Sequence, residues 1–163
     1  MIKTSNYNNC HTDKYQVYSI SRDKGEDANY VGDYFLALAP KREFFKTWRH
    51  NRGLIDEVTN NEYYMKEFYE QVLKPLNPEE IYEKLDNSIL LCYEEHNEFC
   101  HRHIVAAWFE LALGIDVKEV IINGFKEEIL DRPEYIKEYL NKLMMNDNKT
   151  IEKQMIKKLW LIS

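Results

Sequence analysis

The sequence has few of the residues that interrupt regular secondary structure or cross-link the chain. Its 163 residues include only 5 glycines, 4 prolines and 3 cysteines. Few glycines and prolines favour long regular elements over tight turns. An odd and small number of cysteines disfavours a disulfide scaffold, so we expect reduced thiols and a cytoplasmic protein.

Long apolar runs and an excess of positive charge are also missing. The longest apolar stretch, 104–114, is interrupted by Glu110 and is too short to span a bilayer, so no membrane association is expected. The first six residues carry no apolar segment or cleavage pattern, which disfavours a signal peptide. A formal net charge of −6 disfavours a nucleic-acid-binding surface spread over the protein. Abundant Asn, Lys, Ile and Tyr indicate an AT-rich coding bias, typical of low-GC bacteria and their phages.

The residues that are present can build one core, since 44% are hydrophobic and 13% aromatic. Strands are predicted at 2–7, 15–21, 34–39, 88–94 and 117–122, and helices from Pro40, from Asn60 or Asn61, at 79–85 and at 100–113. Strand, helix and strand in succession over 88–122 are typical of a βαβ unit. We therefore predict an α/β fold, a single domain with a small, mostly parallel sheet flanked by helices, over residues 1–124.

The tail, 125–163, has a different character. Two amphipathic stretches follow the candidate caps Asp131 and Thr150, and the polar triplet 146–148 separates them. This pattern predicts a C-terminal helical hairpin. Its apolar stripes either pack on the domain's own sheet, form a homodimer interface or serve as a lid.

The most informative stretch joins the strand at 88–94 to the following helix. Ligands of open α/β sheets bind beyond the carboxyl ends of the strands, where Cys92 and Glu94 share one face. Cys100, His101 and Arg102 lie in the first turn of the helix, where free N–H groups favour an anion and a thiolate. Arg102 adds a planar donor for phosphate or carboxylate. The candidate catalytic groups are therefore Glu94, Cys100 and His101, with Cys92 and Arg102 as ligand-binding residues.

Structural roles for the same residues stay open. Cys92 can be a small apolar residue of a buried strand, and Cys100 continues the apolar stripe of its helix. Glu94 and Arg102 can form a structural salt bridge.

The segments Leu90-Leu91-Cys92-Tyr93-Glu94 and Phe99-Cys100-His101-Arg102 resemble the signature of the domain of unknown function 488 family, a strand ending in Cys-x-Glu and a helix beginning Cys-His-Arg. The resemblance covers about 1–120 and implies an α/β domain with a site at these residues, but no established reaction. It adds Ser5, Tyr7 and Arg22, from the opening strand and the end of the second strand, as ligand-binding residues. Ser21 departs from the family, which often carries Asp before this Arg.

Three functions fit this site. The first is an enzyme acting on a nucleotide, a nucleoside or a nucleic-acid-derived phosphate ligand, with Glu94 as general base and His101 as proton donor. The second is a protein that binds such a ligand without turnover. In both, the partner is a small phosphate or nucleotide-like molecule. In the second, Tyr7, Tyr18 or Tyr93 stacks on the base.

The third function is a metal site at Cys92, Cys100, His101 and His103, with Cys10 and His11 as further candidates. Adjacent helical residues such as Cys100 and His101 point about 100° apart, and no Cys-x-x-Cys pair exists. We therefore assign no metal and identify no cofactor. The basic residues over 41–52 favour a solvated helix face over a groove for nucleic acid.

Overall fold

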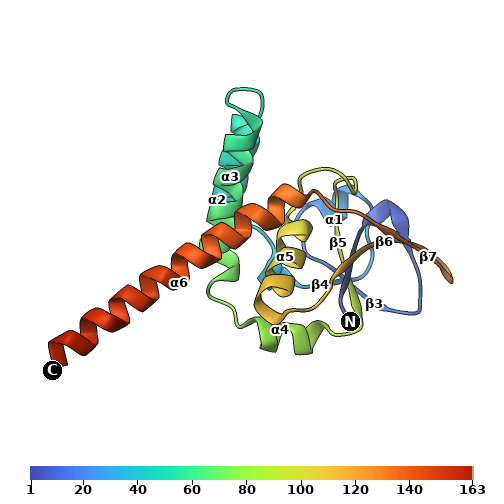
Figure 1. Ribbon diagram of the computed structural model, residues 1–163. Coiled ribbons are helices and arrows are strands. Elements are labelled where there is room, and N and C mark those ends of the chain that lie inside the picture. The colour runs from blue at the N-terminus through green and yellow to red at the C-terminus, as the bar shows by residue number, and fades with distance from the viewer. Residues whose placement is uncertain (163) are drawn as a thin grey trace.

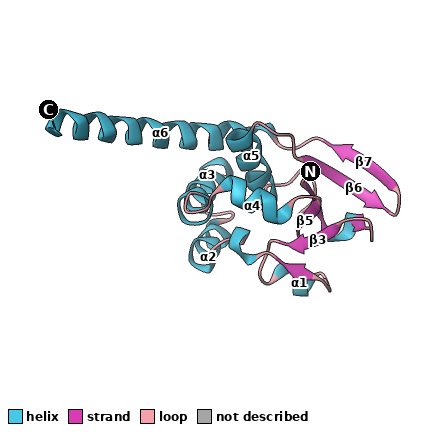
Figure 2. Cartoon of the chain, turned by 90° about the horizontal axis from the view of Figure 1, so that it is seen from below, coloured by secondary structure: helices cyan, strands magenta, loops and turns pink. Residues whose placement is uncertain are grey.

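The computed structural model describes residues 1–162. It is an α/β fold in which helices pack on one face of a single sheet (Figures 1 and 2). The strands are β1 (Lys3–Asn6), β2 (Cys10–His11), β3 (Gln16–Ser19), β4 (Asp33–Tyr34), β5 (Ser88–Cys92), β6 (Lys118–Asn123) and β7 (Lys126–Leu130). The helices are α1 (Lys24–Asp27), α2 (Arg42–Asn51), α3 (Glu57–Phe68), α4 (Pro78–Leu85), α5 (His101–Leu113) and α6 (Glu134–Ile162). The predicted fold class, a small and mostly parallel sheet flanked by helices, is confirmed.

The sheet is parallel except at one edge. Its order is β2-β6-β1-β5-β3-β4, and β7 pairs antiparallel with β6. Both β1 and β2 pair with β6, because the short 3₁₀ turn η1 (Tyr7–Asn9) lets the chain leave the sheet and rejoin it. β5, α5 and β6 form the predicted βαβ unit, which crosses β1.

β5 is the centre of the sheet, between β1 and β3, and all five of its residues are buried. Leu90 faces the helices, whereas Ile89 and Leu91 pack on the opposite face against Val120 and Ile122. This alternation also points Cys92 toward the helices, because side chains two apart share a face. The opposite face is covered by aromatic side chains, Tyr7, Tyr15 and Tyr30, rather than by a helix layer.

Two buried amides join α2 to α3. The predicted caps Asn60 and Asn61 are wrong, because Asp56 caps α3 by accepting from the Thr59 N–H at 2.9 Å. Asn60 Nδ2 instead donates to the Trp48 carbonyl at 2.9 Å, and Trp48 Nε1 donates to Asn61 Oδ1 at 3.0 Å. These bonds satisfy the indole N–H and fix the Trp48 ring. The π-helical turn η3 (Tyr69–Leu73) continues α3.

The predicted C-terminal hairpin is wrong, because α6 is one helix of 29 residues. The polar triplet 146–148 does not break it. Asp147 accepts hydrogen bonds from Tyr69 Oη at 3.1 Å and from Lys74 Nζ at 2.8 Å, so this turn is held against the domain. Thr150 bonds to the Asn146 carbonyl within the helix at 3.0 Å instead of capping a second helix. The predicted domain boundary at residue 124 falls in the turn between the paired strands β6 and β7.

The two halves of α6 differ in burial. Ile136 and Leu140 are buried against the domain, and Leu143 and Met144 pack beside them. After Asp147 the helix projects away from the body of the protein (Figure 1). That half exposes several large apolar side chains, Ile151, Met155, Ile156, Leu159, Trp160, Leu161 and Ile162. Over residues 1–162, no helix is long and apolar enough to cross a membrane.

The same substitution at two positions of α6 will separate its halves. Leu140 is fully buried and Leu159 is 66% exposed. Leu140→Ala should lower the free energy of unfolding by about 2–5 kcal/mol through the lost apolar burial and the cavity left behind. Leu159→Ala should change it by less than about 0.5 kcal/mol, both measured by urea denaturation. An equal loss at Leu159 would mean that another molecule covers this half, as the predicted homodimer requires.

Candidate functional site

A cavity of about 110 Å³ opens beyond the carboxyl ends of β3 and β5. Cys92, Cys100 and His101 lie at its inner end and are almost completely buried. Most of the remaining lining is an aromatic wall and a charged rim, with Phe45, Trp48, Tyr64 and Phe99 in the wall and Arg22, Asp23, Asp27, Arg42, Arg49 and Glu94 in the rim. Ser21 and Pro40 also line the cavity. The location agrees with the rule used to predict the site from the sequence.

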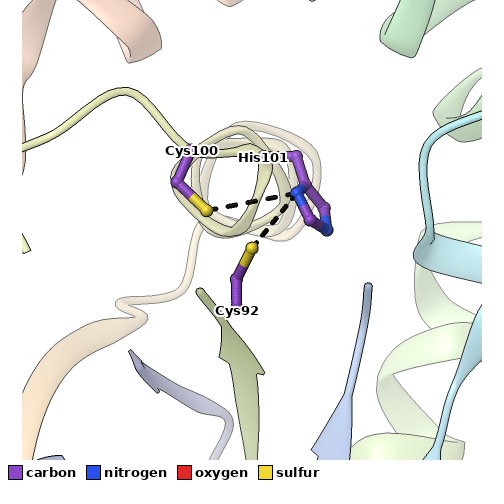
Figure 3. Close-up of side chains that lie close together, drawn as sticks. All are labelled: Cys92, Cys100 and His101. Carbon is purple, nitrogen blue, oxygen red and sulfur yellow. Dashed lines mark hydrogen bonds between the residues drawn. The ribbon is translucent and has the colours of Figure 1, made fainter. Parts of the chain in front are cut away.

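The His101 ring has a defined orientation at the inner end. Its Nε2 lies 2.7 Å from the Ile20 carbonyl oxygen, which can only accept a hydrogen bond. Nε2 therefore carries the proton, and in the neutral ring Nδ1 keeps a free lone pair. Nδ1 faces Cys92 Sγ at 3.4 Å and Cys100 Sγ at 4.0 Å (Figure 3).

Cys92 also contacts Glu94. The thiol donates toward Glu94 Oε2 at 3.3 Å, as expected for two residues on the same face at the end of a strand. Glu94 is half-buried, so its carboxylate joins the buried inner end of the cavity to the solvent side. A proton acceptor therefore stands on each side of the Cys92 sulfur, Glu94 and His101.

Cys100 differs from the sequence expectation in two ways. Burial raises the pKa of its thiol well above the usual value, and the charge of Arg102 opposes this only weakly, so no thiolate is favoured here. Cys100 is also the N-cap of α5, with an extended backbone at φ −154° and ψ 145°. The 100° divergence of adjacent helical residues does not apply to it, and Cys92 Sγ, Cys100 Sγ and His101 Nδ1 lie within 4.8 Å of one another.

Arg102 does not line the cavity, which corrects the prediction that it binds an anion there. Its side chain is fully buried, Nε donates to Glu119 Oε2 at 3.0 Å, and Nη2 donates to the Glu95 carbonyl at 3.1 Å. One helical step of about 100° turns it away from the side that His101 occupies. The salt bridge weighed from the sequence exists, but its carboxylate is Glu119 and not Glu94.

A family model described as "Active DUF488-N3 subclade" matches residues 3–113, from β1 to the end of α5. The chain belongs to this family. The resemblance drawn from the Cys-x-Glu and Cys-His-Arg segments is thereby confirmed. The matched span holds every residue that lines the cavity, whereas β6, β7 and α6 lie outside it. No curated protein and no solved structure matches the chain.

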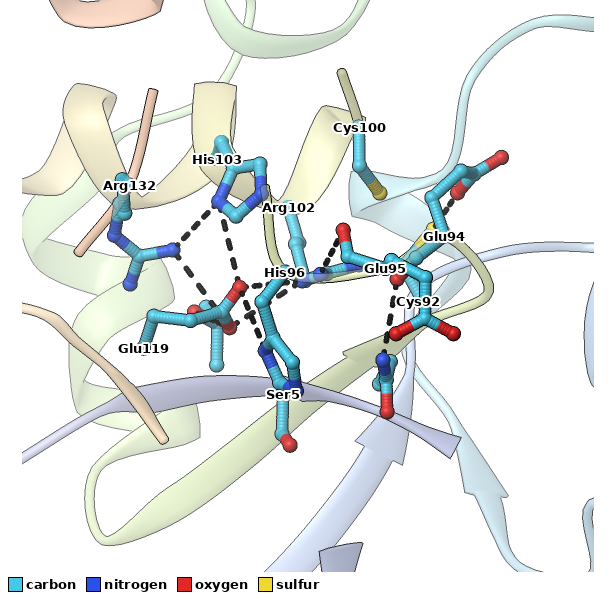
Figure 4. A network of polar contacts seen from close by, with 12 residues as sticks. Ser5, Cys92, Glu94, Glu95, His96, Cys100, Arg102, His103, Glu119 and Arg132 are labelled. Carbon is cyan, nitrogen blue, oxygen red and sulfur yellow. Dashed lines mark hydrogen bonds and ion pairs between the residues drawn. The ribbon is translucent and has the colours of Figure 1, made fainter. Parts of the chain in front are cut away.

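Glu119 is the centre of a buried polar network in this DUF488 chain (Figure 4). Besides Arg102, its carboxylate accepts from Thr4 Oγ1 at 2.9 Å, and His96, His103 and Arg132 lie 3.4, 3.6 and 3.9 Å away. Burial raises the pKa of Glu119, but His96 and the two arginines outweigh burial and hold the pKa well below its usual range. The sequence signal for this residue was a lone carboxylate in the apolar strand 117–122.

The residues that the resemblance added lie in different places. Ser5 is buried, donates to the Val120 carbonyl at 2.6 Å, and does not line the cavity. Tyr7 lies behind the cavity wall, where its hydroxyl bonds to Ser19 Oγ at 2.6 Å and to Ser21 Oγ at 2.5 Å. Arg22 does line the cavity, and its Nε donates to the Pro40 carbonyl at 3.3 Å.

Sequence reasoning missed the contribution of α2. Arg42, Phe45, Trp48 and Arg49 all line the cavity. Their signal was the mixed basic and aromatic composition of 41–52, which was interpreted as a solvated helix face. The pairing of α2 with α3 turns part of this face toward the site, through the amide bonds to Trp48.

Glu119→Gln should lower the free energy of unfolding by about 3–5 kcal/mol, because it leaves Arg102 buried without a counter-charge. Glu128→Gln on exposed β7 is the matched control and should stay within about 0.5 kcal/mol of the wild type.

The cost of Glu119→Gln should also depend on pH. A lowered folded-state pKa gives a contribution that is present above the unfolded value of 4.5 and is lost as the pH falls through the folded pKa. Urea denaturation over a pH series should therefore show the gap between wild type and Glu119→Gln narrowing below about pH 4.5. The same gap at pH 3 and pH 7 would contradict this assignment.

Proposed function

We propose that this DUF488 chain is an enzyme that acts on a phosphate-bearing nucleotide, nucleoside derivative or nucleic-acid-derived ligand bound in the cavity. One observation supports this most strongly. A single cavity joins three arginines and Glu94 at its rim to Cys92 and His101 at its inner end. Cations that hold a substrate and groups that exchange protons thus share one space, as an active site requires.

The rim arginines take the role that the sequence gave to Arg102. Arg22 follows β3, whereas Arg42 and Arg49 come from α2. Arg42 lies 3.6 Å from Asp23, with both side chains at least 70% exposed, so this ion pair is weak and can be exchanged for a ligand phosphate. A guanidinium binds phosphate through two parallel hydrogen bonds.

The rim also carries carboxylates. Asp23, Asp27 and Glu94 balance the formal charge of the three arginines. The cavity is therefore not a general trap for anions. It suits a ligand that offers hydroxyl or amino groups beside its phosphate, as a nucleotide does.

The aromatic wall suits a planar ring. Trp48 lies 5.7 Å from Phe99 and 5.8 Å from Phe45, centroid to centroid, and Asn61 holds its indole N–H. A fixed aromatic surface of this kind provides stacking for a nucleobase. The tyrosines considered for stacking from the sequence, Tyr7, Tyr18 and Tyr93, do not line the cavity.

Proton transfer is assigned to Glu94. Its carboxylate is half-buried at the cavity and accepts a hydrogen bond from the Cys92 thiol at 3.3 Å. A carboxylate so placed takes the proton of an attacking nucleophile while the arginines stabilise charge on the ligand phosphate. The description of the matched family calls the subclade active, which favours turnover over capture without reaction.

Glu94→Gln should lower turnover by about 100-fold or more, because the amide cannot accept the proton. Ligand affinity should change by less than about threefold, since the shape of the side chain is kept. The measurement is mass-spectrometric detection of products from a panel of nucleoside phosphates, dinucleotides and end-phosphorylated oligonucleotides. A ligand that binds tightly and is recovered intact from the wild type would contradict catalysis and indicate a binding protein.

Arg49→Gln should weaken ligand binding by about tenfold or more, the value of one charge-assisted hydrogen bond to phosphate. Lys46→Gln removes a charge from the same helix at an exposed position outside the cavity lining and should leave affinity unchanged. Calorimetric titration with the best ligand of the panel measures both. Equal losses in the two variants would indicate a general electrostatic effect and not a rim contact.

A further inference from the structure

We infer that Cys92, Cys100 and His101 bind a zinc ion, with one coordination position open to the cavity. The distances between the three side chains fit a metal ion. Tetrahedral zinc with Zn–S bonds of about 2.3 Å and Zn–N bonds of about 2.0 Å places sulfur and nitrogen ligands about 3.5 Å apart. In this chain the two sulfur-to-Nδ1 distances are 3.4 and 4.0 Å. An ion therefore fits between the three atoms with small side-chain shifts (Figure 3).

The His101 imidazole has the orientation of a metal ligand. A histidine that binds a metal nearly always donates its other ring N–H to a carbonyl or a carboxylate, which aims the free lone pair. His101 has this arrangement, because Nε2 donates to the Ile20 carbonyl at 2.7 Å and Nδ1 faces both thiols. The accepting carbonyl belongs to Ile20, directly after β3, so the sheet fixes the orientation of the imidazole ring.

Two thiols lie beside the same imidazole nitrogen. A cysteine nucleophile with a histidine base needs one thiol, yet two thiols from different elements face the same lone pair. A metal ion accounts for both. Two sulfurs and one imidazole are soft to borderline ligands, which favour zinc over magnesium or calcium.

The group of three ligands is open toward the cavity. Structural zinc sites are closed by four protein ligands, whereas catalytic sites keep three and leave a position for water or substrate. Among the described residues the group contains three cysteine and histidine ligands, and all three line the cavity. Glu94 Oε2 lies 3.3 Å from Cys92 Sγ, next to this position. One of the two sequence observations against a metal, the 100° divergence of Cys100 and His101, assumed a helical Cys100, and the extended N-cap backbone removes it.

The metal site deepens the proposed function, and only the role of its water rests on that function. Zinc held by these three residues would activate a bound water as the nucleophile, and Glu94 would accept the proton of that water as its oxygen attacks the electrophilic carbon or phosphorus of the ligand. Glu94 would then give the proton to the leaving group as the bond between that group and the ligand breaks. No oxidant or reductant takes part.

The test uses the full chain and the metal alone. Elemental analysis of the purified protein should find about one zinc per chain, as expected for a site with a three-residue ligand set. After removal by a chelator, Co²⁺ should restore a thiolate-to-cobalt charge-transfer band and the intense visible bands of a tetrahedral ion. Cys92→Ser and Cys100→Ser should each lose the charge-transfer intensity of one thiolate and bind metal at least tenfold more weakly. Cys10→Ser is the matched control, since Cys10 lies on β2 outside the group, and should behave as the wild type.

The wild type decides the outcome whether or not a variant folds. A folded wild-type chain, judged by circular dichroism, that holds no zinc and gives no cobalt band overturns the metal site. Equal metal binding in both serine variants and the wild type does so as well. Stoichiometric zinc without turnover of any ligand in the panel would contradict the proposed function and support the metal site. Full turnover by the folded, metal-free chain would remove the role of the bound water and leave the enzyme.

Discussion

The geometry of the cavity depends on the buried ion pair between Arg102 of α5 and Glu119 of β6. Removing two charges from water is costly unless the pair is well bonded. Here the Thr4 hydroxyl and the Glu95 carbonyl supply further hydrogen bonds. The pair ties α5 to the β1–β6 side of the sheet and fixes the rotation of the helix about its axis. Once this rotation is set, the preceding residue must face the other way.

That rotation gives consecutive residues separate roles. His101 faces β3 and the cavity, whereas Arg102 faces β6 and the ion pair. Cys100 precedes the helix, so its extended backbone brings its thiol back toward His101. Three adjacent residues thus serve two sites on opposite sides of one helix turn. Cys100 and His101 line the cavity, whereas Arg102 and Glu119 do not.

The rest of the cavity comes from distant segments that meet at one end of the sheet. The loop after β3 supplies Arg22, and α2 supplies arginines and the aromatic wall. α2 is held in place by amide bonds from α3 to Trp48, inside a cluster of aromatic rings. The proposed division of labour follows from this assembly. In the function proposed above, the rim would bind the charged part of a ligand, the wall would bind its ring, and the inner end would carry out the chemistry.

The sequence alone determined the α/β class, the strand–helix–strand unit and the location of the site, because apolar periodicity and strand ends are local properties. It also placed Cys92, Glu94, Cys100 and His101 together, since they flank one short loop. Only the tertiary structure decided the partner of Arg102, the contribution of α2 and the continuity of α6. Each of these depends on contacts between segments far apart in the chain, such as Arg102 with Glu119 and Asp147 with Lys74. Local patterns cannot specify which side of a helix forms such a contact. The side that forms it determines which residues face the cavity.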